Sequence, residues 1–181
     1  MITIISSTNR PGSNTRKLAE EAKAMFIANG EKDVQFLSLE ELTADMFGTD
    51  MYNPEAQSKK LHEIQDKYII PARKFYFVIP EYNGGFPGIL KTFIDACSMR
   101  KGVESFKDGK KAAVLGLAMG RAGNLRGLEH FLGILNYLQI TVMPNIQPLA
   151  MIHTHLDEAG KIKDEHIRTT VEKHVQQFIA F

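Results

Sequence analysis

The sequence has almost no cysteine: Cys97 is the only one in 181 residues. A single thiol excludes an internal disulfide, a zinc site built from several cysteines and an iron–sulfur cluster held by cysteine ligands. No apolar stretch approaches the roughly 20 residues of a membrane-spanning helix. The opening run, Met1 to Ile5, has no basic segment and is too short for a signal peptide. We therefore expect a cytoplasmic protein that does not enter a membrane.

Charge of one sign is not in excess either. The 22 Lys and Arg residues against 21 Asp and Glu residues give a formal net charge of +1, and they are spread along the chain. Such a balance gives no electrostatic reason to expect nucleic acid or an anionic membrane surface as a partner. A chain of 181 residues is long enough for one substantial core and short for two. We expect a single domain over residues 1–181.

Short β-branched and aromatic runs alternate with helical patterns along the chain. Strands are predicted at residues 2–6, 34–37, 74–79, 112–117 and 140–143. Helices are predicted at residues 18–29, 57–69, 89–96 and 125–138, and from 162 or 167 to the C-terminus. Residues 40–56 show no regular pattern. The alternation predicts an α/β fold, an open five-stranded parallel sheet with helices on both faces.

Three polar, glycine-bearing loops follow predicted strands, at residues 7–15, 80–88 and 118–124. The carboxyl ends of parallel strands meet at one edge of the sheet. In open sheets of this class, ligands bind at that edge. We therefore expect the three loops to form one site.

The first loop has the composition of a phosphate-binding site. It offers hydrogen-bond donors and a fixed positive charge, and it opens the next helix with unpaired N–H groups. The donors are Ser7, Thr8, Ser13, Asn14 and Thr15, and the charge is Arg10. Neither G-x-x-x-x-G-K-[ST] nor G-x-G-x-x-G is present. Taken alone, the same residues could simply cap a helix.

The second loop, residues 80–88, follows a strand of aromatic and β-branched residues and precedes a predicted helix, and its Pro87 suits the first turn of that helix. Its glycines would let backbone amides approach the edge of a planar heterocycle, while Tyr82 shields or stacks on it. A tight turn is the alternative. Glu81 could serve as a base, but a salt-bridged or solvated carboxylate is the simpler interpretation.

Two motifs make the chain resemble the NADPH-dependent FMN reductase family, which includes flavodoxin-like quinone, chromate and azo-dye reductases. One is Ser-x-x-Arg-x-x-Ser-x-Thr at residues 7–15, and the other is Pro-Glu-Tyr-Asn-Gly-x-x-Pro-Gly-x-Leu-Lys at residues 80–91. The resemblance implies a flavodoxin-like fold and non-covalently bound FMN. It implies that the phosphate lies on Ser7, Arg10, Ser13, Asn14 and Thr15, and the isoalloxazine against Pro80, Glu81, Tyr82, Asn83 and Gly84.

The third loop departs from the family pattern. It is shorter than is common in the family and lacks a Gly-Gly pair, although Leu125-Arg126 follows it as in the family. Gly120 and Arg121 are carried over as flavin contacts by position only.

Other residues with reactive or metal-binding side chains have simpler interpretations. His62 and Glu63 begin like H-E-x-x-H, but the motif ends in Asp66, so a surface helix is expected. His153 and His155 fit a loop, with the mouth of a pocket as the alternative. Cys97 fits a small buried residue better than a nucleophile.

The resemblance implies an FMN-dependent oxidoreductase that takes hydride from NADPH or NADH and passes it to a small-molecule acceptor such as a flavin or quinone. The two substrates would use the flavin in turn, and no catalytic side chain is expected. An electron-transfer flavoprotein and a flavin-free α/β nucleotide-binding or regulatory module are the alternatives.

The amphipathic helix at 125–138 contains Gly127 and Gly133, which permit close helix approach, and family members form dimers there. A homodimer or a dimer of dimers is expected.

Overall fold

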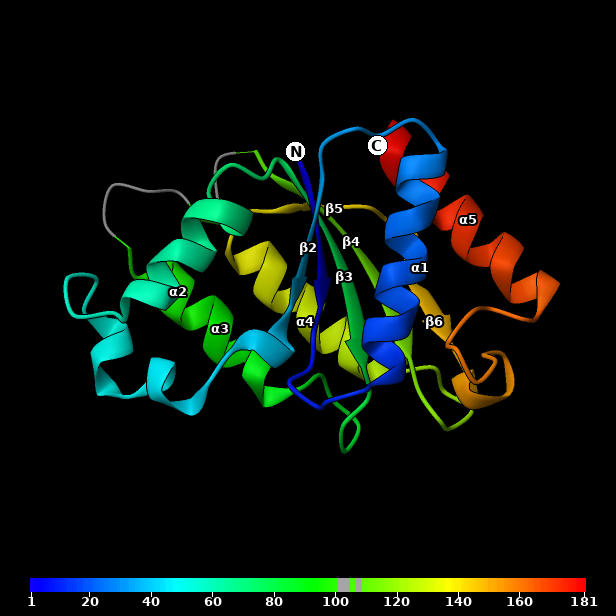
Figure 1. Cartoon of the computed structure of the whole chain (residues 1–181), viewed down its shortest axis with the longest axis horizontal. Helices are drawn as coiled ribbons and strands as arrows, with labels where there is room; N and C mark the ends of the chain where they lie inside the picture. The colour runs from blue at the N-terminus through cyan, green and yellow to red at the C-terminus, as the bar shows by residue number, and fades with distance from the viewer. Residues whose placement is uncertain (101–104, 107–108) are drawn as a thin grey trace.

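The computed structural model describes residues 1–100, 105–106 and 109–181. Its β-strands form one sheet in which neighbouring strands are parallel (Figure 1). The strands are β1 (Ile2–Ser6), β2 (Val34–Ser38), β3 (Lys74–Pro80), β4 (Lys111–Leu117), β5 (Thr141–Val142) and β6 (Gln147–Leu149). Their order is β2-β1-β3-β4-β5, with β6 also beside β4. This is the flavodoxin-like order, so the predicted fold class is confirmed.

The fifth position of the sheet differs from the prediction of one strand at 140–143. Two short strands share that position, since β5 pairs with the start of β4 and β6 pairs with its end. Met143 still donates its N–H to Ala112 O at 2.8 Å, but Pro144 follows and has no N–H to continue the ladder. β6 itself contains Pro148, which an edge strand tolerates.

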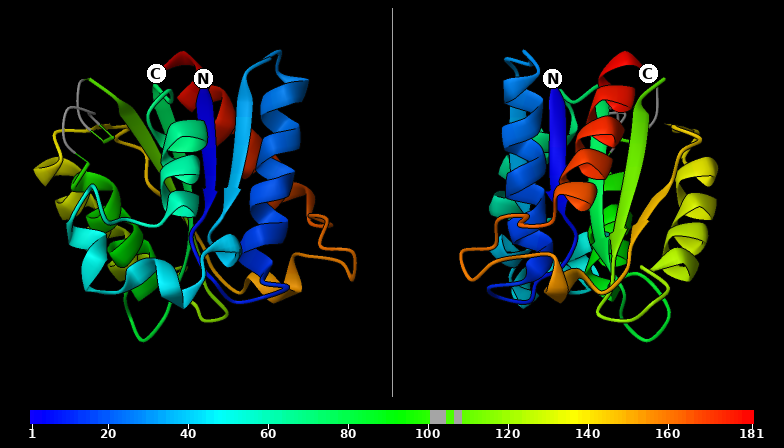
Figure 2. Two further views of the ribbon diagram at one scale, coloured as in Figure 1. Left: turned by 60° about the vertical axis from the view of Figure 1, so that its left-hand side comes forward. Right: turned by 90° about the vertical axis from the view of Figure 1, so that its right-hand side faces the viewer.

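Helices cover both faces of the sheet, as predicted. They are α1 (Asn14–Ala28), α2 (Lys59–Ile64), α3 (Gly88–Ser98), α4 (Leu125–Tyr137) and α5 (Glu165–Ala180). Figures 1 and 2 show α1 and α5 side by side on one face and α2, α3 and α4 on the other.

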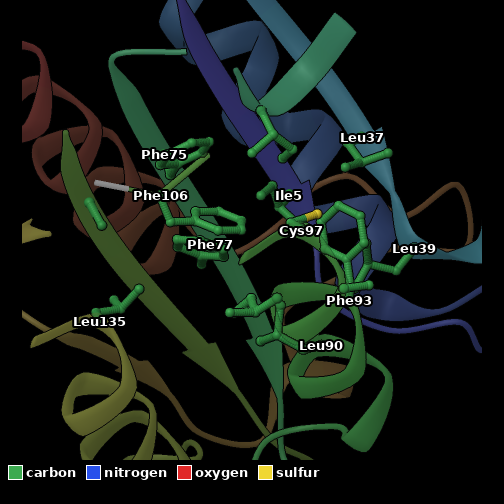
Figure 3. Close-up of a cluster of buried hydrophobic side chains, with 14 of the residues drawn as sticks. Ile5, Leu37, Leu39, Phe75, Phe77, Leu90, Phe93, Cys97, Phe106 and Leu135 are labelled. Atoms are coloured by element: carbon green, nitrogen blue, oxygen red, sulfur yellow. The ribbon is translucent and has the colours of Figure 1, made fainter. Parts of the chain in front are cut away.

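The core has two halves because side chains alternate along each strand. On β3, Phe75 and Phe77 point to the face covered by α3 and α4, whereas Tyr76 and Val78 point to α1 and α5. All four side chains are fully buried. Figure 3 shows the first half, in which Phe77 lies among side chains from β1, β2, α3 and α4.

Helix boundaries follow capping residues. Ser13 caps α1, and Gly30 follows its end with φ +93°, a conformation that suits glycine. Asp164 caps α5, so this helix begins between the two starts that the sequence left open. Pro87 stands at the N-cap of α3, one position before the first turn predicted for it.

Residues 40–56 contain no α-helix or β-strand, as expected from their lack of a regular pattern. Three 3₁₀ turns occupy most of this segment, η1 (Leu39–Glu41), η2 (Ala44–Phe47) and η3 (Thr49–Tyr52). The helix predicted at 57–69 is α2 followed by a π-helical segment, η4 (Gln65–Ile69). In the described part of the chain, none of the helices combines the length and apolar character needed to cross a bilayer.

Candidate functional site

A cavity of about 430 Å³ opens at the carboxyl edge of the sheet, where the loops after β1, β3 and β4 meet at the lower edge of Figure 1. Its volume falls within the range of small-molecule and cofactor sites. The lining residues are Arg10, Pro11, Gly12, Ser13, Asn14, Thr15, Pro80, Glu81, Tyr82, Leu117, Ala118, Met119 and Ile152. The structure therefore brings together the three loops that the sequence singled out.

The first loop wraps the start of α1. Ser13 Oγ accepts the Arg16 N–H at 3.1 Å, and Ser13 O accepts the Lys17 N–H at 3.3 Å. In the described residues, the N–H groups of Asn14 and Thr15 have no acceptor, as is usual in the first turn of a helix. Arg10 is exposed and makes no ion pair within the described residues. Free N–H groups, a helix dipole and an unpaired guanidinium together suit a phosphate.

Ser7 lies beneath this loop and does not line the cavity. Its side chain is fully buried, its Oγ donates to Ile5 O at 3.3 Å, and its N–H donates to Val78 O at 3.0 Å. In this conformation, Ser7 supports the loop from below.

The second loop is a two-residue hairpin. Tyr82 and Gly85 exchange backbone hydrogen bonds of 2.9 and 3.0 Å, while Asn83 and Gly84 have φ of +52° and +77°. Positive φ at both central residues is typical of a type I′ turn, for which Asn-Gly is the preferred sequence. The tight-turn interpretation is thus confirmed. Asn83 and Gly84 form its exposed tip beside the cavity and do not line it.

The hairpin is seated on the start of α4. Gly127 leaves room for it, since a Cβ there would lie 2.8 Å from the backbone carbon of Gly85. Phe86, just after the hairpin, packs against Phe131 with ring centroids 5.3 Å apart. Asn124, which precedes α4, donates from Nδ2 to Ile79 O at 2.9 Å. These contacts fix the position of Pro80 to Tyr82 relative to the cavity.

Glu81 lines the cavity and is half-buried. Its N–H donates to Leu117 O at 3.0 Å, which continues the β3–β4 ladder by one residue. Its carboxylate has no ion pair or hydrogen bond within the described residues, so of the two simpler interpretations the solvated carboxylate fits and the salt bridge does not.

The third loop contributes Ala118 and Met119, next to Leu117 at the end of β4, rather than the carried-over pair. Gly120 and Arg121 are exposed and lie outside the cavity lining. This loop is joined to the segment after β6, because Ile152 donates its N–H to Ala118 O at 3.0 Å. Ile152 enters the cavity lining through that contact.

These residues fit FMN, because one end of the cavity suits a phosphate and the other offers backbone and apolar surface for a flat ring. Comparison with known proteins decides the family: the sequence profile of NADPH-dependent FMN reductases matches residues 1–154. The chain belongs to the NADPH-dependent FMN reductase family. The resemblance stated from the two motifs is confirmed, and the protein is a flavin-dependent oxidoreductase with FMN as its cofactor and NAD(P)H as its co-substrate.

Individual relatives agree with this assignment. The chain is 31% identical over 139 residues to an NAD(P)H-dependent FMN reductase of Pseudomonas aeruginosa, covering 74% of this chain and 73% of that protein. It is 28% identical over 141 residues to a 2-hydroxy-1,4-benzoquinone reductase of a Burkholderia species, covering 76% of each. The fold matches that of the NAD(P)H:acceptor oxidoreductase FerB from Paracoccus denitrificans, with a TM-score of 0.74, 23% identity and coverage of 99% and 94%.

The other side chains that the sequence offered as reactive or metal-binding do not line the cavity of the FMN reductase. Cys97 is fully buried beside Phe93 in the core of Figure 3, and burial raises the pKa of its thiol well above the usual value. It is a packed side chain, as the sequence suggested. His62 contacts Pro54 O at 3.0 Å, and His155 Nδ1 lies 2.8 Å from Asp164 Oδ2. Among the described residues, no group of three His, Cys, Asp or Glu side chains could hold a metal.

Sequence reasoning missed six lining residues of the FMN reductase site. Pro11 and Gly12 lie inside the first motif, so a complete reading of that loop would have included them. The other four missed residues are apolar and belong to no motif: Leu117, Ala118, Met119 and Ile152. Leu117 and Ala118 could have been found from their place at the end of β4. Ile152 depends on a tertiary hydrogen bond that has no local signal.

Proposed function

We propose that the protein oxidises NADPH or NADH at FMN bound in this cavity and reduces a quinone, a free flavin or a similar small molecule in a second half-reaction. The observation that carries the proposal is one cavity that joins the start of α1, which suits a phosphate, to the Pro80–Tyr82 backbone. The relatives named as FMN and benzoquinone reductases support the choice of acceptors. Bound FMN supplies the hydride chemistry between the two substrates.

The chain's own residues bind, orient and shield. The N–H groups of Asn14 and Thr15 and the guanidinium of Arg10 hold the phosphate. The backbone from Pro80 to Tyr82 positions the flavin ring in the cavity. Apolar residues exclude water from one side of the cavity: Leu117, Ala118, Met119 and Ile152. No side chain is assigned as an acid or base, so positioning is the protein's contribution to the rate.

Initial rates of NADPH and NADH oxidation test this function. With FMN-loaded protein, varied nucleotide and varied quinone, parallel lines in a double-reciprocal plot are expected because one substrate leaves before the other binds. Intersecting lines would contradict the two-step scheme. Bound FMN with no oxidation of either nucleotide would instead favour an electron-transfer flavoprotein, and failure to take up FMN would favour the flavin-free module.

We also propose that this single cytoplasmic domain works as a homodimer through α3 and α4, alone or as a dimer of dimers. Tyr137 at the end of α4 is 86% exposed, and the space beside Gly133 is open. A groove between the two helices is lined partly by Ile94, Ile134 and Leu138. Sedimentation at micromolar concentration should show a dimer that Tyr137→Glu dissociates. A monomeric wild type would contradict the proposal.

A further inference from the structure

A carboxylate stands directly behind the phosphate-binding end of the cavity. Glu40 lies in η1, immediately after β2, and its side chain is only 13% exposed. Its Oε1 accepts a hydrogen bond from Ser13 Oγ at 3.4 Å, and its Oε2 pairs with Arg16 Nη1 at 3.1 Å. The Glu40 N–H donates to Ser38 Oγ at 3.3 Å, which anchors the backbone that carries the carboxylate.

The hydroxyl of Ser13 has one proton to donate, and Glu40 accepts it across the 3.4 Å contact. The same oxygen accepts the Arg16 N–H at 3.1 Å. Ser13 also lines the cavity. A phosphate oxygen that takes a hydrogen bond from Ser13 must therefore displace the Glu40 carboxylate from that proton.

The guanidinium of Arg16 is held in the same way. Its Nε pairs with Glu20 at 3.0 Å and its Nη1 with Glu40, and hydrogen bonds to Glu20 and then Glu40 raise its pKa. Arg16, Glu20 and Glu40 form one charged cluster, and none of the three lines the cavity. Arg10 does line the cavity, and it makes no ion pair among the described residues.

We propose that Glu40 competes with the phosphate of FMN for the Ser13 proton, and so weakens phosphate binding and keeps the flavin exchangeable. This rests on the proposed function, because it takes the phosphate of FMN as the ligand of the helix start. Two negative groups that share one donor repel each other, and partial burial of Glu40 lessens the screening by water. Glu40 is a positioning residue that acts through Ser13, and Arg16 holds its carboxylate in place.

The test compares FMN with riboflavin, which has the same ring system and no phosphate. Glu40→Gln keeps the size of the side chain and removes its charge. We expect this variant to bind FMN about tenfold more tightly than the wild type in a fluorescence titration, equal to about 1.4 kcal/mol, with riboflavin affinity unchanged. Slower release of FMN from the variant during dilution is the matching kinetic result.

Two neighbouring glutamates provide controls. Glu41→Gln changes the next residue, which is exposed, and should leave both affinities unchanged. Glu20→Gln frees Arg16 from its other partner without touching Ser13, so its effect should be smaller than that of Glu40→Gln. If Glu40→Gln does not fold, as judged by thermal unfolding, Glu40→Ala removes the same charge and carries the same expectation.

The outcomes separate this inference from the proposed function. Equal tightening by Glu20→Gln and Glu40→Gln would overturn it, since net charge alone would then explain the result. Equal effects of Glu40→Gln on FMN and riboflavin, or no effect on FMN, would also overturn it and leave the flavin site standing. Failure of the wild type to bind FMN at all would remove the proposed function as well.

Discussion

The hydroxyl groups of Thr8 and Tyr82 lie 2.6 Å apart, and this contact joins the loop after β1 to the loop after β3. Thr8 is fully buried, and its Oγ1 also accepts the Arg10 N–H at 3.2 Å. Arg10 and Tyr82 both line the cavity, and they are connected through this one oxygen. The phosphate-binding end and the ring-binding end are therefore held in a fixed relation by a residue that does not line the cavity.

Removing either hydroxyl should weaken the link between the loop after β1 and the loop after β3. Tyr82→Phe is expected to weaken FMN binding by about 1 kcal/mol, the usual contribution of one hydrogen bond. Thr8→Val should cost more, because it also removes the acceptor of the Arg10 N–H. The double variant should be little worse than Thr8→Val alone, because the contact between the two hydroxyls is lost only once. Additive losses in a titration would contradict the link. Thr3→Val is the matched control, since Thr3 Oγ1 donates to Tyr68 O at 2.7 Å in another part of the core.

Gly127 allows the hairpin to sit on α4. In Gly127→Ala the new methyl group would lie 2.8 Å from Gly85 C and 2.1 Å from Asn124 Oδ1. We expect a loss of about 1 to 3 kcal/mol in the free energy of unfolding, as for other overpacked sites, together with weaker FMN binding as the hairpin shifts. Denaturant unfolding and FMN titration measure the two effects.

Gly133→Ala is the control on the same helix. A Cβ at Gly133 meets nothing within 4 Å. Alanine is the better helix former by about 1 kcal/mol, so this variant, compared with the wild type at concentrations where both are monomeric, should be more stable in denaturant unfolding and bind FMN unchanged. Equal destabilisation by the two alanines would show that close packing at Gly127 is not the cause.

His174 makes stability depend on pH. Its ring is buried between α5 and β3, with Nδ1 2.8 Å from the Tyr76 hydroxyl and Nε2 3.0 Å from Asn145 O. Burial lowers the pKa of His174 from 6.5 to about 4. The unfolded chain therefore binds the proton first as pH falls, and the contribution of neutral His174 to stability, present above pH 6.5, is lost as pH falls through about 4.

The loss attributable to this group is about 3 kcal/mol between those pH values. Urea unfolding measured across the range should show it as a falling free energy of unfolding. His174→Gln should flatten the slope, while His166→Gln, at an exposed position of the same helix, should keep it. A slope unchanged in His174→Gln would assign the pH dependence to other groups.

The sequence predicted the sheet well where strands are long and apolar, as in β3 and β4, because a fully buried strand must be a continuous apolar run. β6 was missed, since three residues that include Pro148 form a strand only beside the end of β4. The loops of the site were located because each follows a strand. The contact of Glu40 with Ser13 was out of reach, because it depends on how η1 after β2 folds back towards the start of α1.

Titration of FMN into the wild type and Arg10→Ala tests most directly whether the helix start and Arg10 hold the phosphate of FMN. We predict saturable binding of one FMN per chain by the wild type and a loss of about 1 to 3 kcal/mol in Arg10→Ala, as for a charge-assisted hydrogen bond. Arg73→Ala, at the opposite edge of the sheet, should bind like the wild type. Equal FMN affinity in Arg10→Ala and the wild type would contradict the account.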